Sequence, residues 1–270
     1  MERTSLKVIA VYAGPRREWS GKDSIEESRK VINYWLNLLK TVNYGEGMDV
    51  VFVNSEPDSY QDNEKYKSFV SMLNNLKGKK IKTGGKIMIE HRPNMGFMLG
   101  AYNYAFNKYK EDYNYFWFSE DDRFNIIEGS LVNGIEKIES SKDTKKPVGF
   151  ICTQAYIRRG KFRSTGCRGS AGISSSEILK KMYDETTGLP HFSMRKYKAR
   201  EDHSNMGLAE KMEYKLVDYI KKNEYKIGHL DNQYGISIIW GRPGGGPHWN
   251  QYRKGWSARI VDYCQACSGD

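Results

Sequence analysis

The sequence predicts an α/β fold with a mostly parallel central sheet flanked by helices. Short apolar runs, typical of buried strands, alternate with longer segments whose apolar residues recur at helical spacing. Three consecutive acids, Glu120, Asp121 and Asp122, directly follow the aromatic run YFWF. Acids this close together repel one another, and in α/β proteins the ends of strands are where ligands bind. The acids therefore indicate a site.

The first half of the chain alternates strands and helices. We expect buried strands over Leu6–Gly14, Asp49–Asn54, Lys86–His91 and Tyr115–Phe118. We expect helices after a capping box formed by Ser24 and Glu27, and over Asp62–Leu76 and Phe97–Tyr109. This alternation is what predicts parallel pairing of the strands.

The second half is less regular. Residues 147–160 and 224–232 indicate strands, and residues 174–185 indicate a helix capped by Ser174 with Glu177. A longer helix is expected over residues 201–223. Residues 241–250, rich in glycine and proline, are expected to form a loop.

Composition restricts the partners and the compartment. The net charge of +10 favours anionic partners, which include nucleotides, phosphorylated lipids, a membrane surface and nucleic acid. The segment Lys77–Lys86 is expected to be a solvated loop before a strand. No apolar run is long enough to span a membrane and no signal peptide precedes the first strand, so we expect a cytoplasmic protein, with peripheral membrane association open. The role of Cys264 and Cys267, which have the spacing of half a zinc site, stays open.

A motif now adds a family resemblance. The segment NMGFMLGAYNYA after the third strand, the acids after the fourth and a later Glu-Asp pair resemble family 2 glycosyltransferases of the GT-A fold, the nucleotide-diphospho-sugar transferase fold. The family pattern NxGxxxARNxG matches at Asn94, Gly96, Ala101 and Asn103, whereas Tyr102 stands where arginine is usual. The acidic motif is usually DxD, and here its first acid is a glutamate.

The resemblance implies a set of site residues. Donor binding would involve Tyr12, Ala13, Gly14, Glu56 (or Asp58), Asn94, Gly96, Asn103, Glu120 and Asp121. A divalent metal, Mn²⁺ or Mg²⁺, would be held by Asp122 with Glu120, and His248 on a glycine-rich loop is a candidate third ligand. Arg168, Gly169 and Ser170 would line the acceptor or sugar pocket. Asp202 would be the catalytic base, with Glu201 the next candidate.

These expectations define a glycosyltransferase that moves a sugar from a nucleotide-diphosphate donor to an unidentified acceptor, which can be a glycan, a lipid or a protein. The resemblance favours inversion at the anomeric carbon. Residues 1–235 would form the GT-A domain, with a donor half to about 125 and an acceptor half beyond it. Residues 236–270 would form a C-terminal extension that can act as a lid.

Two alternatives stay open. One is a nucleotidyltransferase of related fold, which would normally carry a glycine-rich phosphate loop after the first strand, but AGPRREWSGK has only two glycines. The other is a catalytically silent module that binds carbohydrate or nucleic acid through aromatic faces and lysines. Three intact acids argue against a silent module.

Overall fold

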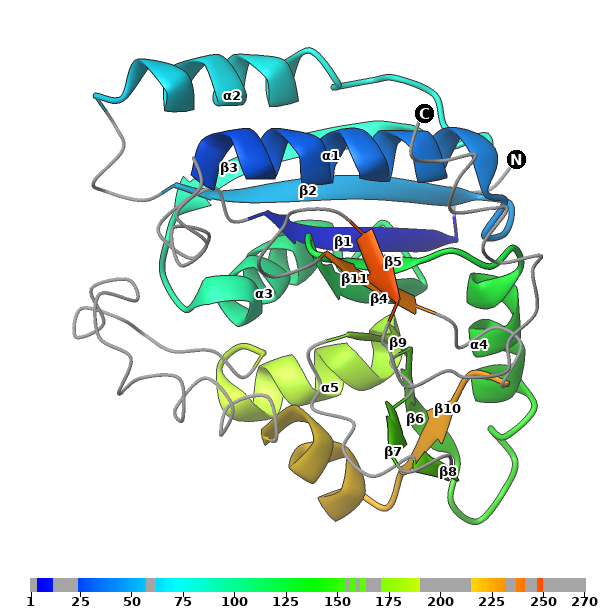
Figure 1. The fold of residues 1–270 in the computed structure, drawn as a ribbon. Coiled ribbons are helices and arrows are strands. Elements are labelled where there is room, and N and C mark those ends of the chain that lie inside the picture. Colours follow the sequence, from blue (N-terminus) through cyan, green and yellow to red (C-terminus); the bar gives the residue numbers. More distant parts are fainter. Residues whose placement is uncertain are drawn as a thin grey trace.

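A seven-stranded mixed sheet forms the centre of the computed structural model. The structure describes residues 4–11, 24–56, 62–153, 156–158, 161–163, 171–189, 215–231, 237–240 and 247–249. The sheet has the order β10-β6-β9-β4-β1-β2-β3 (Figure 1). Its strands are β1 (Ser5–Val11), β2 (Met48–Glu56), β3 (Ile87–Pro93), β4 (Tyr115–Glu120), β6 (Val148–Cys152), β9 (Gly172–Ser175) and β10 (Lys226–His229). Only β9 is antiparallel to its neighbours in this sheet, so the predicted α/β class with a mostly parallel sheet is confirmed.

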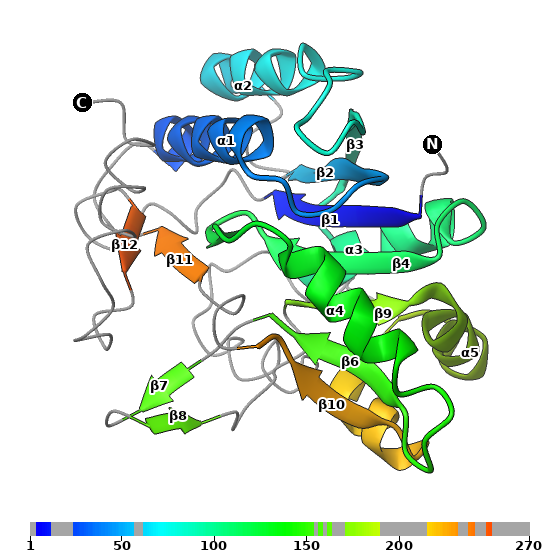
Figure 2. The ribbon, with the colours of Figure 1, turned by 90° about the vertical axis from the view of Figure 1, so that its right-hand side faces the viewer.

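Helices cover both faces of the sheet (Figures 1 and 2). They are α1 (Ser24–Thr41), α2 (Glu64–Asn74), α3 (Phe97–Tyr109), α4 (Ser130–Glu139) and α5 (Ser176–Thr186). Residues 215–222 are also helical. One core cluster joins the sheet to α1, α2 and α4, and the other joins it to α3, α5 and residues 215–222.

Burial on both faces explains why apolar residues follow one another without a break in the middle of the strands. Within β4, Trp117 faces the α1 side, while its neighbours Phe116 and Phe118 face the α3 side, and all three are buried. Side chains alternate along a strand, so a strand covered on both faces favours apolar residues at successive positions. The predicted helix over Phe97–Tyr109 is confirmed at both ends, and α2 is shorter than predicted by two residues at each end.

A second, three-stranded sheet lies beside the end of β4. It consists of β5 (Arg123–Asn125), β11 (Ser237–Trp240) and β12 (Pro247–Trp249), in antiparallel pairs. The prediction that residues 241–250 are entirely loop is therefore wrong at its end. β12 begins at Pro247 and is an edge strand of this small sheet. Proline has no backbone N–H, and at a sheet edge the strand can lack this donor without losing a hydrogen bond to a neighbouring strand.

Other differences arise in the second half of the chain. Residues 147–160 form two strands, β6 and β7 (Tyr156–Arg158), and β7 pairs with β8 (Lys161–Arg163) rather than continuing β6. The cap of α5 is Ser175, whose Oγ accepts from Ile178 N–H at 3.4 Å. The predicted cap, Ser174, lies in β9 instead and donates to Gly149 O at 2.6 Å. Of the helix expected over residues 201–223, only 215–223 lies in the described part, and 215–222 is helical.

Candidate functional site

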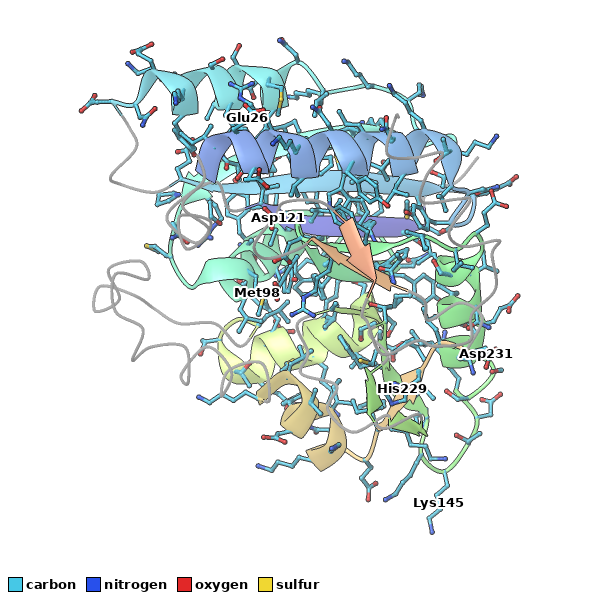
Figure 3. The ribbon with its side chains drawn as sticks, in the orientation of Figure 1. Glu26, Met98, Asp121, Lys145, His229 and Asp231 are labelled. Carbon is cyan, nitrogen blue, oxygen red and sulfur yellow. The ribbon has the colours of Figure 1, made fainter. Side chains whose placement is uncertain are left out.

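The three acids lie where the strand order of the sheet reverses. From β1, the chain adds β2 and β3 on one side and then β4 on the other. Glu120, the last residue of β4, pairs with Ala10 of β1, and the N–H of Asp121 donates to Ala10 O at 3.0 Å. Asp121 is near the middle of the molecule (Figure 3). Open α/β sheets bind ligands outside the carboxyl ends of their strands at such a reversal, so the predicted position of the site fits the topology.

The acids differ in accessibility. Glu120 is 4% exposed and Asp121 is 0% exposed, whereas Asp122 is half-buried in the turn that follows β4. The Glu120 Oε2 atom lies 3.4 Å from Nε of Arg123, which offsets part of the charge of this carboxylate. A hard cation takes oxygen ligands that can be reached from solvent. Asp122 is therefore the acid best placed to meet one.

Two aromatic side chains form hydrogen bonds with the backbone of the turn that carries the three acids. Trp35 Nε1–H, from α1, donates to Asp121 O at 2.8 Å, and Tyr44 Oη–H donates to Asn125 O at 2.6 Å. Inside the turn, Ser119 Oγ–H has Arg123 O as an acceptor at 3.0 Å. Buried hydrogen bonds to backbone carbonyls fix the path of a turn more tightly than exposed ones. The acids are thus presented by a turn that is braced at both ends.

The same aromatic residues enclose a buried lysine. Lys7 Nζ lies 3.1 Å from the ring centroid of Trp117, 5.0 Å from that of Trp35 and 5.4 Å from that of Tyr44. Lys7 is 0% exposed, and burial lowers the pKa of its amine well below the ordinary value. Within the described residues no hydrogen-bond acceptor meets Nζ. Ring faces are therefore the main compensation for burying this amine.

A second polar cluster, here called the β2–β3 cluster, consists of Ser55, Glu56, Arg92 and Asn94 at the carboxyl ends of β2 and β3. Arg92 is 7% exposed, its Nη1–H donates to Ser55 Oγ at 3.0 Å, and its Nη2–H donates to Met95 O. Burial lowers the pKa of Arg92 to about 10. The N–H of Asn94 donates to Glu56 O at 3.1 Å, which joins the two strand ends. The Asn94 Oδ1 atom is buried and accepts no hydrogen bond from any described residue.

His91 orients the Glu56 end of this cluster. Its Nδ1 atom lies 3.4 Å from Glu56 Oε1 and 3.2 Å from Asn54 Nδ2, and its Nε2 atom lies 2.9 Å from Asn74 Oδ1. Both ring nitrogens have polar partners, Nδ1 on β2 and Nε2 at the end of α2. The ring is therefore held beside Glu56 from both sides.

The motif before and within α3 is explained in part. Gly96 has φ 75°, in the left-handed region that glycine adopts without strain. Tyr102, at the position where the family has arginine, is 2% exposed and packs on Phe118 with ring centroids 4.7 Å apart, so it belongs to the core. Asn103 Oδ1 accepts from Leu189 N–H at 2.7 Å, a bond that ties α3 to the segment after α5. A role in donor binding stays a prediction for Gly96 and Asn103.

Several predicted site residues lie outside the part of the chain that the structure describes. They are Tyr12, Ala13, Gly14, Asp58, Arg168, Gly169, Ser170, Glu201, Asp202 and the side chain of His248. Among the described residues, no group of three or more His, Cys, Asp or Glu is arranged to hold a metal ion. Mg²⁺ is commonly held by one or two carboxylates together with substrate phosphates, a mode that needs no such group. Asp122 fits that mode.

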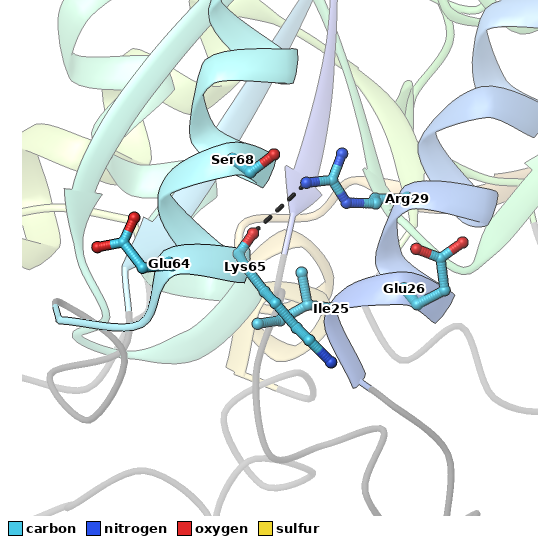
Figure 4. Close-up of a pocket in the computed structure, with 6 residues that line it drawn as sticks. All are labelled: Ile25, Glu26, Arg29, Glu64, Lys65 and Ser68. Carbon is cyan, nitrogen blue, oxygen red and sulfur yellow. Dashed lines mark hydrogen bonds between the residues drawn. The ribbon is translucent and has the colours of Figure 1, made fainter.

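A groove of about 520 Å³ opens between the first turns of α1 and α2 (Figure 4). It is lined by Ile25, Glu26, Arg29, Glu64, Lys65 and Ser68. The Nη2–H of Arg29 donates to Lys65 O at 3.5 Å across it. Both helices follow carboxyl ends of strands, so the groove opens on the same edge of the sheet as the acids. Acids and bases line it in equal number, so charge does not select its ligand.

Sequence reasoning missed the residues that support the site. In the sequence, Trp35 looks like any other apolar residue of a helix, and Tyr44 looks like an apolar residue after the end of that helix. Their hydrogen-bond acceptors are more than eighty positions away. Ser55 and Arg92 gave a usable signal, since each lies among the polar residues that follow an apolar run at a strand end, as the acids do. A search for polar residues at every strand end would have found them.

Comparisons with known proteins are limited to weak structural similarity. No protein-family model and no curated protein matches the sequence. A cytidylyltransferase from Leptospira borgpetersenii serovar Hardjo-bovis has 14% identity and a TM-score of 0.40, with 87% of this chain and 78% of that chain covered. β-1,4-Galactosyltransferase 7 from Drosophila, in complex with manganese, UDP-Gal and xylobiose, has 10% identity and a TM-score of 0.43, with 96% and 79% covered. A 4-diphosphocytidyl-2C-methyl-D-erythritol synthase from Anaerococcus prevotii has 10% identity and a TM-score of 0.38, with 86% and 89% covered.

Similarity at this level carries no weight for function, which is therefore inferred from the residues of this chain. No helix in the described ranges is both long and apolar enough to cross a bilayer.

Proposed function

We propose that this protein is a metal-dependent glycosyltransferase that moves a sugar from a nucleotide-diphosphate donor to an acceptor. One observation carries the proposal: a braced turn places Asp122, half-buried, at the reversal point of the sheet, with Glu120 and Asp121 behind it. A leaving nucleoside diphosphate develops negative charge, and a divalent cation at this turn would supply the charge that stabilises it. The donor diphosphate would therefore lie over the ends of β1 and β4.

The β2–β3 cluster supports a place for the rest of the donor nucleotide. The ends of β4 and β2 are two strand spacings apart, about 10 Å, which one nucleotide can span from phosphate to base. At that end, the half-exposed carboxylate of Glu56 and the buried Oδ1 atom of Asn94 offer acceptors to the hydroxyl and N–H groups of a ribose or base. Arg92, already bonded to Ser55 and Met95, holds this end in place.

Transfer needs a base on the side opposite the leaving diphosphate. Asp202 is the proposed base, because a direct displacement requires a carboxylate to take the proton of the acceptor hydroxyl. Asp202→Asn is expected to bind donor and to lose transfer by about a hundredfold or more. Transfer at the wild-type rate would move the assignment to Glu201.

The test is a panel of nucleotide sugars scored for release of nucleoside diphosphate, with Mn²⁺ or Mg²⁺ and with chelator. We expect slow, metal-dependent hydrolysis of one donor even without an acceptor. Release of pyrophosphate from a nucleoside triphosphate and a sugar phosphate would instead identify a nucleotidyltransferase. Binding of nucleotide sugars or nucleic acid without turnover under any condition would identify a silent module.

A further inference from the structure

A patch of lysines lies at the amino edge of the sheet, opposite the acids. Residues 77–86, here called the lysine loop, connect the end of α2 to β3. The last turn of α1 is next to this loop, because Lys82 N–H donates to Leu39 O at 2.8 Å. The lysine patch consists of Lys40, Lys77, Lys79, Lys80 and Lys82, which are exposed, and Lys86, which is half-buried.

The lysine loop is pinned to the sheet through its backbone and its small or apolar residues. Ile81 and Thr83 are buried, and Thr83 Oγ–H donates to Met48 O at 2.9 Å. The N–H of Ile87, at the start of β3, donates to Lys79 O at 2.9 Å. A Cβ atom at Gly85 would lie 1.9 Å from Met48 O, so only glycine allows this approach. The lysines between these residues are therefore exposed on a loop whose backbone is fixed to the sheet.

Several surface lysines of this protein are paired with acids, whereas those of the lysine patch have no such partner among the described residues. Elsewhere, Lys30 pairs with Glu27 at 3.1 Å, and Lys180 pairs with Glu111 at 2.6 Å. In the part of the chain that the structure describes, no carboxylate forms an ion pair with the lysine patch. The nearest acid along β2, Asp49, is buried, and it accepts from Tyr113 Oη–H and from the backbone N–H of Lys86, each at 2.7 Å. Within the described residues, no ion pair therefore offsets the positive charge of the patch.

We propose that the lysine patch docks the protein on a membrane surface that carries anionic lipid headgroups. Each lysine near such a surface strengthens binding by about fivefold. The lysine loop contains no aromatic residue, which removes the base stacking that single-stranded nucleic acid binding uses. Its one large apolar residue, Ile81, is 7% exposed, so no side chain of the loop inserts into the lipid and the attraction is electrostatic.

Docking in this way leaves the carboxyl edge, with Asp122, directed away from the bilayer. The proposed function does not enter this inference, since the patch and the acids occupy opposite edges of the sheet. Electrostatic docking has a specific signature: salt releases it, because the screening length falls from about 10 Å at 0.1 M to about 3 Å at 1 M.

The test is co-sedimentation of the full chain with vesicles of phosphatidylcholine alone and with vesicles of equal parts phosphatidylcholine and phosphatidylserine. The wild-type chain is expected to sediment only with the anionic vesicles, and to be released by high salt. The double variant Lys79→Gln/Lys80→Gln should lose about fivefold in partition for each lysine removed. The matched control, Lys65→Gln/Lys67→Gln, removes the same charge from exposed lysines at the other end of α2 and should bind as the wild type does.

Two results would overturn the proposal. One is an equal loss in both double variants, which would mean that net charge and not the patch drives binding. The other is failure of the wild-type chain to sediment with anionic vesicles at low salt, including the case in which it binds a nucleic-acid duplex through the same lysines. Circular dichroism of each variant confirms that the fold is kept.

Discussion

Replacing Lys7 by methionine is expected to stabilise the protein. Lys7 is 0% exposed, and its Nζ atom is enclosed by the rings of Trp35, Tyr44 and Trp117. Methionine has a similar length and no charge, and it packs well against aromatic rings. The substitution therefore keeps the packing and removes the cost of burying an amine.

The magnitude follows from two opposing effects. Taking an ammonium out of water costs several kcal/mol in real proteins, and a desolvated cation–π contact returns about 2 kcal/mol. If the amine folds without its proton, the cost at pH 7 is at most roughly 4.6 kcal/mol, because an unfolded lysine has a pKa near 10.4 and each pH unit is worth about 1.36 kcal/mol. We expect Lys7→Met to raise the free energy of unfolding by about 1–3 kcal/mol at neutral pH.

The effect has a defined pH dependence. Burial lowers the pKa of Lys7 in the folded chain, so between that pKa and 10.5 the unfolded chain binds more protons. Wild-type stability gains from this group as the pH rises through the window, and the advantage of Lys7→Met shrinks toward zero near the upper limit. Other groups titrate alike in both proteins and cancel in the difference.

Urea unfolding followed by circular dichroism, at neutral pH and at several alkaline pH values, measures the difference directly. Lys40→Met, which changes an exposed lysine, is the control and should stay within about 0.5 kcal/mol of the wild type. The reasoning is refuted if Lys7→Met is less stable than the wild type at pH 7. It is also refuted if the difference between the two proteins does not change across the alkaline range.

Two further substitutions test the support of the site and the packing of the sheet. Trp35→Phe removes the hydrogen bond to Asp121 O and part of a buried indole, so we expect a loss of about 1–3 kcal/mol in unfolding free energy and weaker nucleotide binding, measured by urea unfolding and calorimetry. Unchanged nucleotide affinity would mean that the brace does not position the acids. Gly172→Ala would place a Cβ atom 2.1 Å from Phe150 Cε1, so we expect a loss of about 1–3 kcal/mol in urea unfolding, and wild-type stability would show that β9 can move away from β6.

The parallel strands and first three helices were predictable because local patterns specify them. Strands such as β2 and β4 are covered on both faces and contain unbroken runs of four apolar or aromatic residues, and α3 has apolar residues at helical spacing. β9 was not predictable, because its sequence is determined by a contact with a neighbouring strand and not by a local pattern. Gly172 is required by the ring of Phe150 on the neighbouring strand, and a glycine-rich segment reads as loop until that neighbour is known.

α4 and the small sheet also depend on tertiary contacts. Gly134 weakens the helical pattern of α4, yet a Cβ atom there would lie 2.5 Å from Ile173 Cδ1, so the glycine serves the packing of α4 on β9. β5 has three residues and acquires its partner, β11, from more than a hundred positions away. At the site, the acids were predictable because they follow a strand, whereas the brace formed by Trp35 and Tyr44 exists only once the chain has folded.

The proposed function depends most on whether Asp122 holds a divalent metal together with a nucleoside diphosphate. Calorimetric titration of nucleoside diphosphates in the presence of Mn²⁺, repeated in chelator, tests it on the wild type, Asp122→Asn and Asp112→Asn. Asp112 is an exposed acid just before the amino end of the same strand, so it is the matched control. We expect metal-dependent binding by the wild type and Asp112→Asn, with affinity lower by about tenfold or more in Asp122→Asn. Wild-type affinity in Asp122→Asn, or equal binding by the wild type in chelator, would contradict it.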